Sequence, residues 1–141
     1  MFDSTKARWI SLWGNGRNRN LLDLTRGLIP KNDILFFGEE NLLFQAFANL
    51  LDNAIKFTEH DGIIDITLKQ KDKIITIECA DNGVGISDEE KQHIFKRFYR
   101  AEKSRNTEGN GLGLSLVQAI ITYHQGAIKI INNQPKGSIF R

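Results

Sequence analysis

The hydrophobic period of the chain changes near residue 60, and this change constrains the fold more than any other feature. Residues 39–58 repeat apolar side chains at steps of three and four, which predicts one long helix. Residues 62–69 and 73–81 instead alternate apolar and polar side chains, which predicts two strands. Because only the short link around QKDK separates the two runs, we expect an antiparallel hairpin.

Two further helices are expected around this frame. Leu21, Leu24 and Leu28 have helical spacing, which predicts a short helix before Pro30. A capping box, with serine followed three residues later by glutamate, predicts a helix start at Ser87. That helix is expected to carry Ile94, Phe95 and Phe98.

The C-terminal third reads as a loop, a helix and two strands. Residues 100–110 are polar without periodicity, which predicts a loop. Residues 112–124 have helical spacing, and Gly126 is well placed to end that helix. The run AIKIIN and the residues after the turn NQPKG are expected to form the last two strands.

Composition excludes several classes of protein. The 141 residues suit one domain, and a formal charge of +2 implies neither a nucleic-acid nor a membrane partner. The single cysteine excludes an internal disulfide framework and fits a reducing compartment. No apolar run is long enough to span a bilayer, and the N-terminus lacks the apolar core of a signal peptide. We therefore expect a cytoplasmic protein, or the cytoplasmic part of a larger one.

A column of polar side chains lies on the predicted long helix. Asn49, Asn53 and Lys56 are four and three residues apart, so they share one face. A solvated helix face would explain such a column. Two amides and a cation together also suit a hydrated Mg2+ ion beside phosphate oxygens, since Mg2+ takes few protein ligands and prefers oxygen. Asn is a mediocre helix former, which favours the second interpretation.

Two glycine-containing segments follow, DNGVGI (81–86) and GNGLGLS (109–115). Each alone is consistent with an ordinary turn. The first lacks the third glycine of a dinucleotide fingerprint, and the second lacks the Lys-Ser/Thr pair of a P-loop. GNGLGLS opens a helix, however, where backbone N–H groups and the helix dipole favour a phosphate. In the first segment, Asp81 stands at a strand end beside a bare backbone, where its carboxylate can accept a hydrogen bond from an amine.

Taken together and in order, five segments resemble the catalytic, ATP-binding domain of sensor histidine kinases. This domain belongs to the wider group of ATPases that includes gyrase and the mismatch-repair ATPases. The segments resemble, in order, the N box, the first glycine box, the F box, the second glycine box and the last glycine box: NLLDNAIKFT (49–58), DNGVGI (81–86), IFKRFYR (94–100), GNGLGLS (109–115) and GSIF (137–140).

The resemblance implies an α+β fold of the Bergerat type. In this two-layer sandwich, helices cover one face of a mixed, mostly antiparallel sheet. The resemblance covers residues 36–141, with the last strand cut short at Arg141. It leaves residues 1–35 as an atypical or truncated N-terminal segment.

The resemblance also implies ATP and Mg2+ as ligands, and a role for each matched residue. Asn53 would be the Mg2+ ligand, and Asn49 and Lys56 would contact the phosphates. Arg100 would reach the terminal phosphate, and Asp81 would bind the exocyclic amine of adenine. The further binding residues that it implies include two glycines that admit the base, two phenylalanines that anchor a lid, and the hinge and phosphate cradle: Gly83, Gly85, Ile86, Phe95, Phe98, Gly109, Gly111, Leu112, Gly113 and Leu114.

The implied function is transfer of the ATP γ-phosphate to a histidine on a separate dimerisation domain, with a response regulator downstream. Asn49 stands where hydrolase relatives carry a glutamate base, and an amide cannot take a proton. His60, His93 and His124 lack the setting of an acceptor histidine, so the isolated chain is expected not to be self-sufficient. The alternatives are a nucleotide- or partner-binding regulatory module without phosphotransfer, and a related ATP hydrolase, which Asn49 disfavours.

Overall fold

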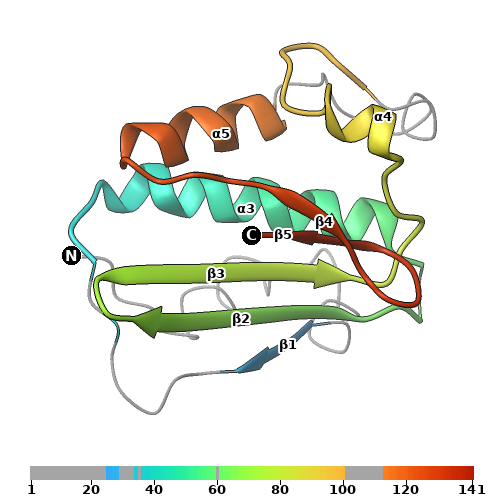
Figure 1. Cartoon of the computed structure of the whole chain (residues 1–141), viewed down its shortest axis with the longest axis horizontal. Coiled ribbons are helices and arrows are strands. Elements are labelled where there is room, and N and C mark those ends of the chain that lie inside the picture. Colours follow the sequence, from blue (N-terminus) through green and yellow to red (C-terminus); the bar gives the residue numbers. More distant parts are fainter. Residues whose placement is uncertain (1–24, 29–33, 35, 60, 101–112) are drawn as a thin grey trace, which may run out of the picture.

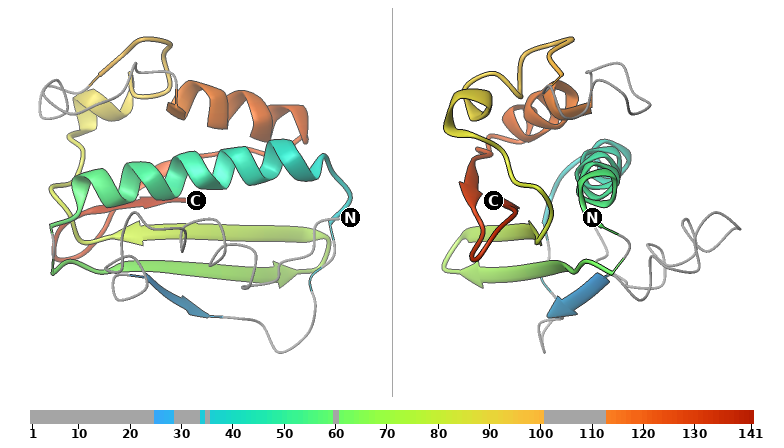
Figure 2. Two further views of the ribbon diagram at one scale, coloured as in Figure 1. Left: turned by 180° about the vertical axis from the view of Figure 1, so that it is seen from behind. Right: turned by 90° about the vertical axis from the view of Figure 1, so that its right-hand side faces the viewer.

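The computed structural model describes residues 25–28, 34, 36–59, 61–100 and 113–141. Within these ranges the chain forms a two-layer α+β structure, in which helices pack on one face of a sheet (Figures 1 and 2). In chain order the elements are β1 (Thr25–Leu28), α3 (Glu40–Phe57), β2 (Ile64–Lys71), β3 (Ile74–Asp81), α4 (Asp88–Lys91), α5 (Gly113–Tyr123), β4 (Ile130–Asn132) and β5 (Ser138–Phe140).

The sheet has the strand order β1-β2-β3-β5-β4. β1 runs parallel to β2, and the other neighbouring pairs are antiparallel. The sheet is therefore mixed and mostly antiparallel, as the family resemblance implied. The right-hand view in Figure 2 looks nearly along α3 and shows α3 and α5 on the same side of the sheet.

The predicted hairpin forms, and its apolar residues share the expected face. In the β2–β3 register, Ile66 lies opposite Cys79 and Leu68 lies opposite Ile77. Only two residues separate the strands, and one of them, Asp72, has a φ of 55°. Asp tolerates this left-handed conformation better than most residues do, which suits it to a two-residue hairpin turn.

The core lies between the sheet and the two long helices. One cluster of buried side chains joins α3 to α5 and the end of β5, and a smaller cluster lies between α3 and the hairpin. The first cluster contains Leu43, Ala46, Leu50, Ile94, Val117, Ile120 and Phe140, and the second contains Leu51, Ala54, Ile64 and Cys79. Burial of these apolar surfaces holds the polar face of α3 in a fixed position.

The prediction of a helix before Pro30 was wrong for the part that the structure describes. Thr25–Leu28 is a strand that pairs with the first half of β2. The open edge of β2 offers backbone hydrogen bonds, and pairing with it overrides the helical spacing of the leucines. Residues 21–24 lie outside the described residues.

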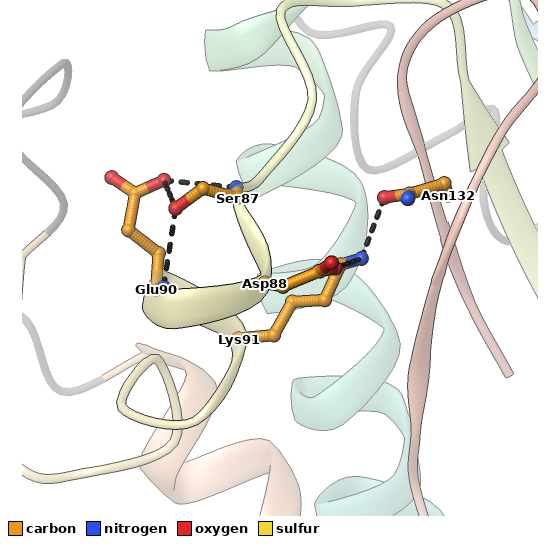
Figure 3. A network of polar contacts seen from close by, with 5 residues as sticks. All are labelled: Ser87, Asp88, Glu90, Lys91 and Asn132. Atoms are coloured by element: carbon orange, nitrogen blue, oxygen red, sulfur yellow. Dashed lines mark hydrogen bonds and ion pairs between the residues drawn. The ribbon is translucent and has the colours of Figure 1, made fainter.

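The predicted capping box forms, but the helix after it is much shorter than expected. The Ser87 hydroxyl accepts from the Glu90 N–H at 3.2 Å, and the Glu90 carboxylate accepts from the Ser87 N–H at 3.0 Å (Figure 3). The helix α4 ends at Lys91, and separate turns follow, such as the four-residue turn 96–99, in which the Tyr99 N–H donates to Lys96 O at 3.2 Å. A continuous helix through Phe98 was therefore a wrong prediction.

Core packing explains why α4 stops early. Ile94 is buried between α3 and α5, and Phe95 and Tyr99 pack against the same cluster. Phe98 takes a left-handed conformation, with a φ of 62°, and points away with 68% of its surface exposed. Separate turns bring Ile94, Phe95 and Tyr99 to the core, whereas helical spacing would have brought Phe98 with the first two.

The end of α5 also differs in detail from the prediction. Gly126 donates its N–H to Ile121 O at 2.9 Å, which closes the helix as expected. The left-handed residue, however, is Gln125, with a φ of 60°. Glycine is favoured at position 126 for a different reason: a Cβ there would lie only 3.0 Å from a methyl group of Ile121.

His124 ties the end of α5 to the start of α3. Its Nε2 accepts from the Glu39 N–H at 3.0 Å, so Nδ1 carries the proton that bonds to Ile120 O at 2.7 Å. Glu39 precedes α3, whose first N–H groups have no partners within the helix. None of the helices in the described ranges is both long and apolar enough to cross a membrane.

Candidate functional site

The polar column lies on the C-terminal half of α3 (Glu40–Phe57). The start of α5 lies over the middle of α3, and β3 ends on the opposite side of the same half of the helix (Figure 1). The structure therefore brings the polar column of α3, the acid that ends β3 and the start of the glycine-led helix to the C-terminal half of α3.

Asn49, in the polar column, faces the start of α5. Asn49 and Asn53 are partly buried, and neither side chain hydrogen-bonds to another residue in the described part of the chain. The Asn49 Oδ1 lies 3.9 Å from the position that a Cβ would take at Gly113. The structure thus brings Asn49 and Gly113 together, as the predicted site requires.

Lys56 is exposed and forms an ion pair with Asp52 on the same helix. The Nζ and the carboxylate oxygen are 2.9 Å apart. Both side chains are more than a third exposed, so water and salt weaken the attraction between them. Exchanging this partner for a phosphate oxygen would therefore cost little.

Asp81 is buried at the end of β3, with 4% of its surface exposed. Its Oδ1 accepts from the Gly83 N–H at 2.9 Å and from the Ser138 N–H at 3.4 Å. Burial raises the pKa of this carboxyl group above its usual range, and the two N–H donors oppose that rise.

The second carboxylate oxygen of Asp81 is open. Oδ2 accepts no hydrogen bond from any described residue. No side-chain polar atom in the described part of the chain is both fully buried and without a partner, so Oδ2 retains contact with solvent. Asp81 therefore offers one oriented acceptor to an amine.

Gly83 and Gly85 serve different purposes. A Cβ at Gly83 would overlap the main-chain oxygen of Phe57, at the end of α3. The close approach seen at Gly83 is therefore to the protein's own backbone. Gly85 has a φ of 75°, which a side chain would disfavour. Their role in admitting a base stays a prediction.

Three residues near Asp81 were missed by sequence reasoning as site residues. Ser138 donates to the Asp81 carboxylate, and Asn133 donates through Nδ2 to the Asp81 main-chain oxygen at 2.7 Å. Gly137, with a φ of 108°, packs so closely that a Cβ would overlap that same oxygen. The segment GSIF was the only signal for Gly137 and Ser138, and Asn133 had none, because residues more than fifty positions away leave no local pattern around Asp81.

The predicted lid residues are only partly described. Phe95 packs against the core, and so do Ile86 and Leu114, but the anchoring role of Phe95 stays a prediction. Phe98 does not, and the Arg97 guanidinium lies 5.7 Å from the centre of its ring. Arg100 is partly buried. The remaining predicted residues, Gly109, Gly111 and Leu112, lie outside the described residues.

Asn53 fits the kind of Mg2+ site that keeps most of its water. Its amide oxygen has no protein partner among the described residues and stands beside Asn49. The described ranges contain no cluster of three or more His, Cys, Asp or Glu side chains arranged to hold a metal ion. A single amide oxygen suits Mg2+ that is otherwise bound by water and substrate phosphates.

Known proteins similar to this chain are sensor kinases. Sensor protein CiaH of Streptococcus pneumoniae is 44% identical over 104 residues, which are 72% of this chain and 23% of that protein. The sensor histidine kinase RppB of Synechocystis is 37% identical over 121 residues, or 84% of this chain and 26% of that protein. This chain thus spans about a quarter of the length of the relatives that it matches.

Solved structures of the same class share the fold. The mycobacterial sensor histidine kinase MprB gives a TM-score of 0.79 at 28% identity and covers 98% of this chain and 92% of that one. A nucleotide-free catalytic domain of histidine kinase ThkA gives 0.75 at 25% identity, over 95% of this chain and 85% of that one. These likenesses confirm the predicted Bergerat fold.

The family assignment agrees with the site. Residues 38–141 match the description "Histidine kinase-, DNA gyrase B-, and HSP90-like ATPase". This match begins just before α3 and includes all five segments that carried the resemblance. The chain belongs to the family of histidine kinase-, DNA gyrase B- and HSP90-like ATPases.

Proposed function

We propose that this chain is the ATP-binding catalytic domain of a two-component sensor histidine kinase. It binds ATP with Mg2+ and transfers the γ-phosphoryl group to a histidine on a separate dimerisation domain, from which a response regulator receives it. Because such a kinase uses the ATP of the cell, we place this domain in the cytoplasm.

The observation that carries the proposal is the oriented carboxylate of Asp81. Its Oδ1 is held by two backbone N–H groups, and its Oδ2 is open. An acceptor of this kind suits the 6-amino group of adenine and disfavours the 6-oxo group of guanine, which is itself an acceptor. Asp81 therefore selects the base.

The polar face of α3 holds the phosphates in this proposal. Asn49 and the N-terminal end of α5 face one another, and N–H groups at a helix start favour phosphate oxygens. Lys56 exchanges Asp52 for a phosphate, and Arg100 contacts the terminal phosphate. Asn53 holds Mg2+, which would neutralise phosphate charge when bound.

Transfer to an external acceptor fits this face better than hydrolysis does. Asn49 cannot take a proton from water, so the site positions phosphate without a general base on α3. A histidine nitrogen needs no such base to attack. The bond from phosphorus to the leaving oxygen breaks, a phosphorus–nitrogen bond forms, ADP leaves, and the imidazole proton passes to solvent.

The proposal is tested with ATP radiolabelled at the γ-phosphate and a histidine-bearing dimerisation domain from a sensor kinase. We expect the chain to bind ATP-Mg2+, to label the added domain, and to label no residue of its own. Asp81→Asn should strongly reduce labelling at an ATP concentration near the dissociation constant of the parent chain. Rapid phosphate release by the chain alone would indicate a hydrolase, and tight binding without transfer would indicate a regulatory module.

A further inference from the structure

Building on the nucleotide site proposed above, we infer that Asn133 is a positioning residue for the carboxylate of Asp81. Asn133 follows β4, and no segment of the sequence resemblance includes it. It lies 52 positions along the chain from Asp81, and its amide bonds to the main chain of that residue. It acts on the base only through Asp81.

Three groups of Asn133 are hydrogen-bonded. The side-chain Nδ2 donates to Asp81 O at 2.7 Å, and the side-chain Oδ1 accepts from the Gln134 N–H at 2.9 Å. The backbone N–H donates to Gly137 O at 3.0 Å. The Asn133 side chain is therefore held in one orientation before a ligand binds. Ligand binding then costs little further side-chain entropy.

The contact lies where the pairing of β3 with β5 ends. Cys79 pairs with Phe140 and Ala80 pairs with Ile139, and Asp81 would come next, opposite Ser138. There the ladder changes. The Asp81 main-chain oxygen accepts from Asn133, and the Ser138 N–H donates to the Asp81 side chain.

This exchange of partners explains how Asn133 controls the carboxylate. A buried carbonyl group without a donor is costly, so the Asp81 main-chain oxygen needs a partner. Because Asn133 is that partner, the Ser138 N–H remains available to Oδ1. Without the Asn133 amide, the main-chain oxygen and the carboxylate would compete for the same N–H.

The loop that carries Asn133 is packed directly on the strand end. A side chain at Gly137 would overlap the Asp81 main-chain oxygen, and the φ of 108° at Gly137 also favours glycine. The loop therefore approaches Asp81 from both of its ends, through Asn133 and through Gly137 with Ser138. Loss of the Asn133 contact should loosen Oδ1 and turn Oδ2 away from the base.

The test compares ATP with purine riboside triphosphate, which lacks the 6-amino group. In the parent chain, the ratio of the affinities for ATP and for purine riboside triphosphate measures how well Asp81 recognises that group. Asn133→Ala should lower this preference about 3- to 10-fold, which corresponds to one hydrogen bond, and should leave the affinity for purine riboside triphosphate nearly unchanged. Asn132→Ala is the matched control, because Asn132 bonds to Lys91 and not to Asp81.

Each outcome separates the positioning role from a structural one. If Asn133→Ala lowers the affinity for both nucleotides equally and leaves the preference for ATP unchanged, the positioning role is wrong. If that variant fails to fold, Asn133→Leu keeps the side-chain size without the donor, and the same preference is measured. If the parent chain binds both nucleotides equally well, Asp81 does not recognise the 6-amino group of adenine. The proposed function then fails independently of Asn133.

Discussion

At the scale of single residues, Asp81 carries opposing demands. Burial disfavours its charged form, while the Gly83 and Ser138 N–H groups favour it. A buried charge of this kind lowers the stability of the free protein, and it strengthens the binding of a ligand that donates a hydrogen bond from an amino group. Sites of this kind commonly exchange stability for binding.

Replacing Asp81 by Asn should weaken ATP binding without unfolding the chain. The substitution removes a charge-assisted hydrogen bond, worth about 1.5–3 kcal/mol, so the dissociation constant should rise about 10- to 100-fold. Calorimetric titration with ATP-Mg2+ measures the change. Parent-like affinity would mean that Asp81 is only a turn residue.

The same pair of proteins should show a pH-dependent difference in stability. The pKa of Asp81 is raised in the folded state from its ordinary value of 3.8, so the folded chain binds more protons than the unfolded chain between the two pKa values. The free energy of unfolding of the parent, relative to Asp81→Asn, should therefore fall as the pH rises through this window. Urea unfolding across the acid range tests it, and a relative stability that rises with pH would contradict the assigned direction.

Asn53→Ala should affect nucleotide binding only when the metal is present. Its oxygen is predicted to bind Mg2+, so the affinity for ATP should fall in Mg2+ and change little in chelator. The two titrations are run on parent and variant side by side. A similar loss in both conditions would indicate a folding defect.

At the scale of elements, the short helix α4 is held at both ends. The capping box closes its start, and Lys91 bonds to Asp88 at 2.7 Å and to Asn132 of β4 at 2.6 Å (Figure 3). The Lys91 side chain is only 16% exposed. These contacts attach the segment after Asp81 to the same strand end that carries Asn133.

Removing the cap should loosen α4 locally. Ser87→Ala removes the acceptor of the Glu90 N–H and should cost about 1 kcal/mol. Amide exchange at Lys91 and Ile94 should then be about fivefold faster. Ser87→Asp is the control, because an Asp side chain also caps helices, and it should retain most of the protection. Unchanged exchange in Ser87→Ala would show that the tertiary contacts alone hold α4.

At the scale of the whole molecule, the two-layer packing places the described parts of the proposed site along the C-terminal half of α3. α3 and α5 run in opposite directions, and the start of α5 lies over the middle of α3, near Asn49 (Figure 1). A ligand held there contacts both layers. Its binding should therefore stabilise the whole fold.

Thermal unfolding measures this coupling. ATP-Mg2+ at 100 times its dissociation constant should add about 2.7 kcal/mol to the free energy of unfolding and raise the melting temperature by several degrees. GTP-Mg2+ at the same concentration should add much less, because its 6-oxo group faces the Asp81 carboxylate. Equal stabilisation by both nucleotides would exclude adenine selection by this chain.

The long helix, the hairpin, the capping box and the family could all be predicted from the sequence. Each of these features follows from a periodic pattern or a motif that spans only a short stretch of sequence, such as the alternation of Ile64, Ile66 and Leu68. The residues that carry the predicted nucleotide contacts on α3 and at the end of β3 were found in the same way. Local chemistry constrains such elements directly.

The strand β1, the early end of α4 and the surroundings of Asp81 depend instead on contacts between residues that are distant in the sequence. β1 is a strand because it pairs with the edge of β2. After α4, separate turns place Phe95 and Tyr99 against the core and leave Phe98 exposed. Asn133 and Ser138 reach Asp81 across more than fifty residues of chain. Partners so distant in sequence are chosen by the packing of the sheet, because short-range patterns contain no information about which strand ends will meet.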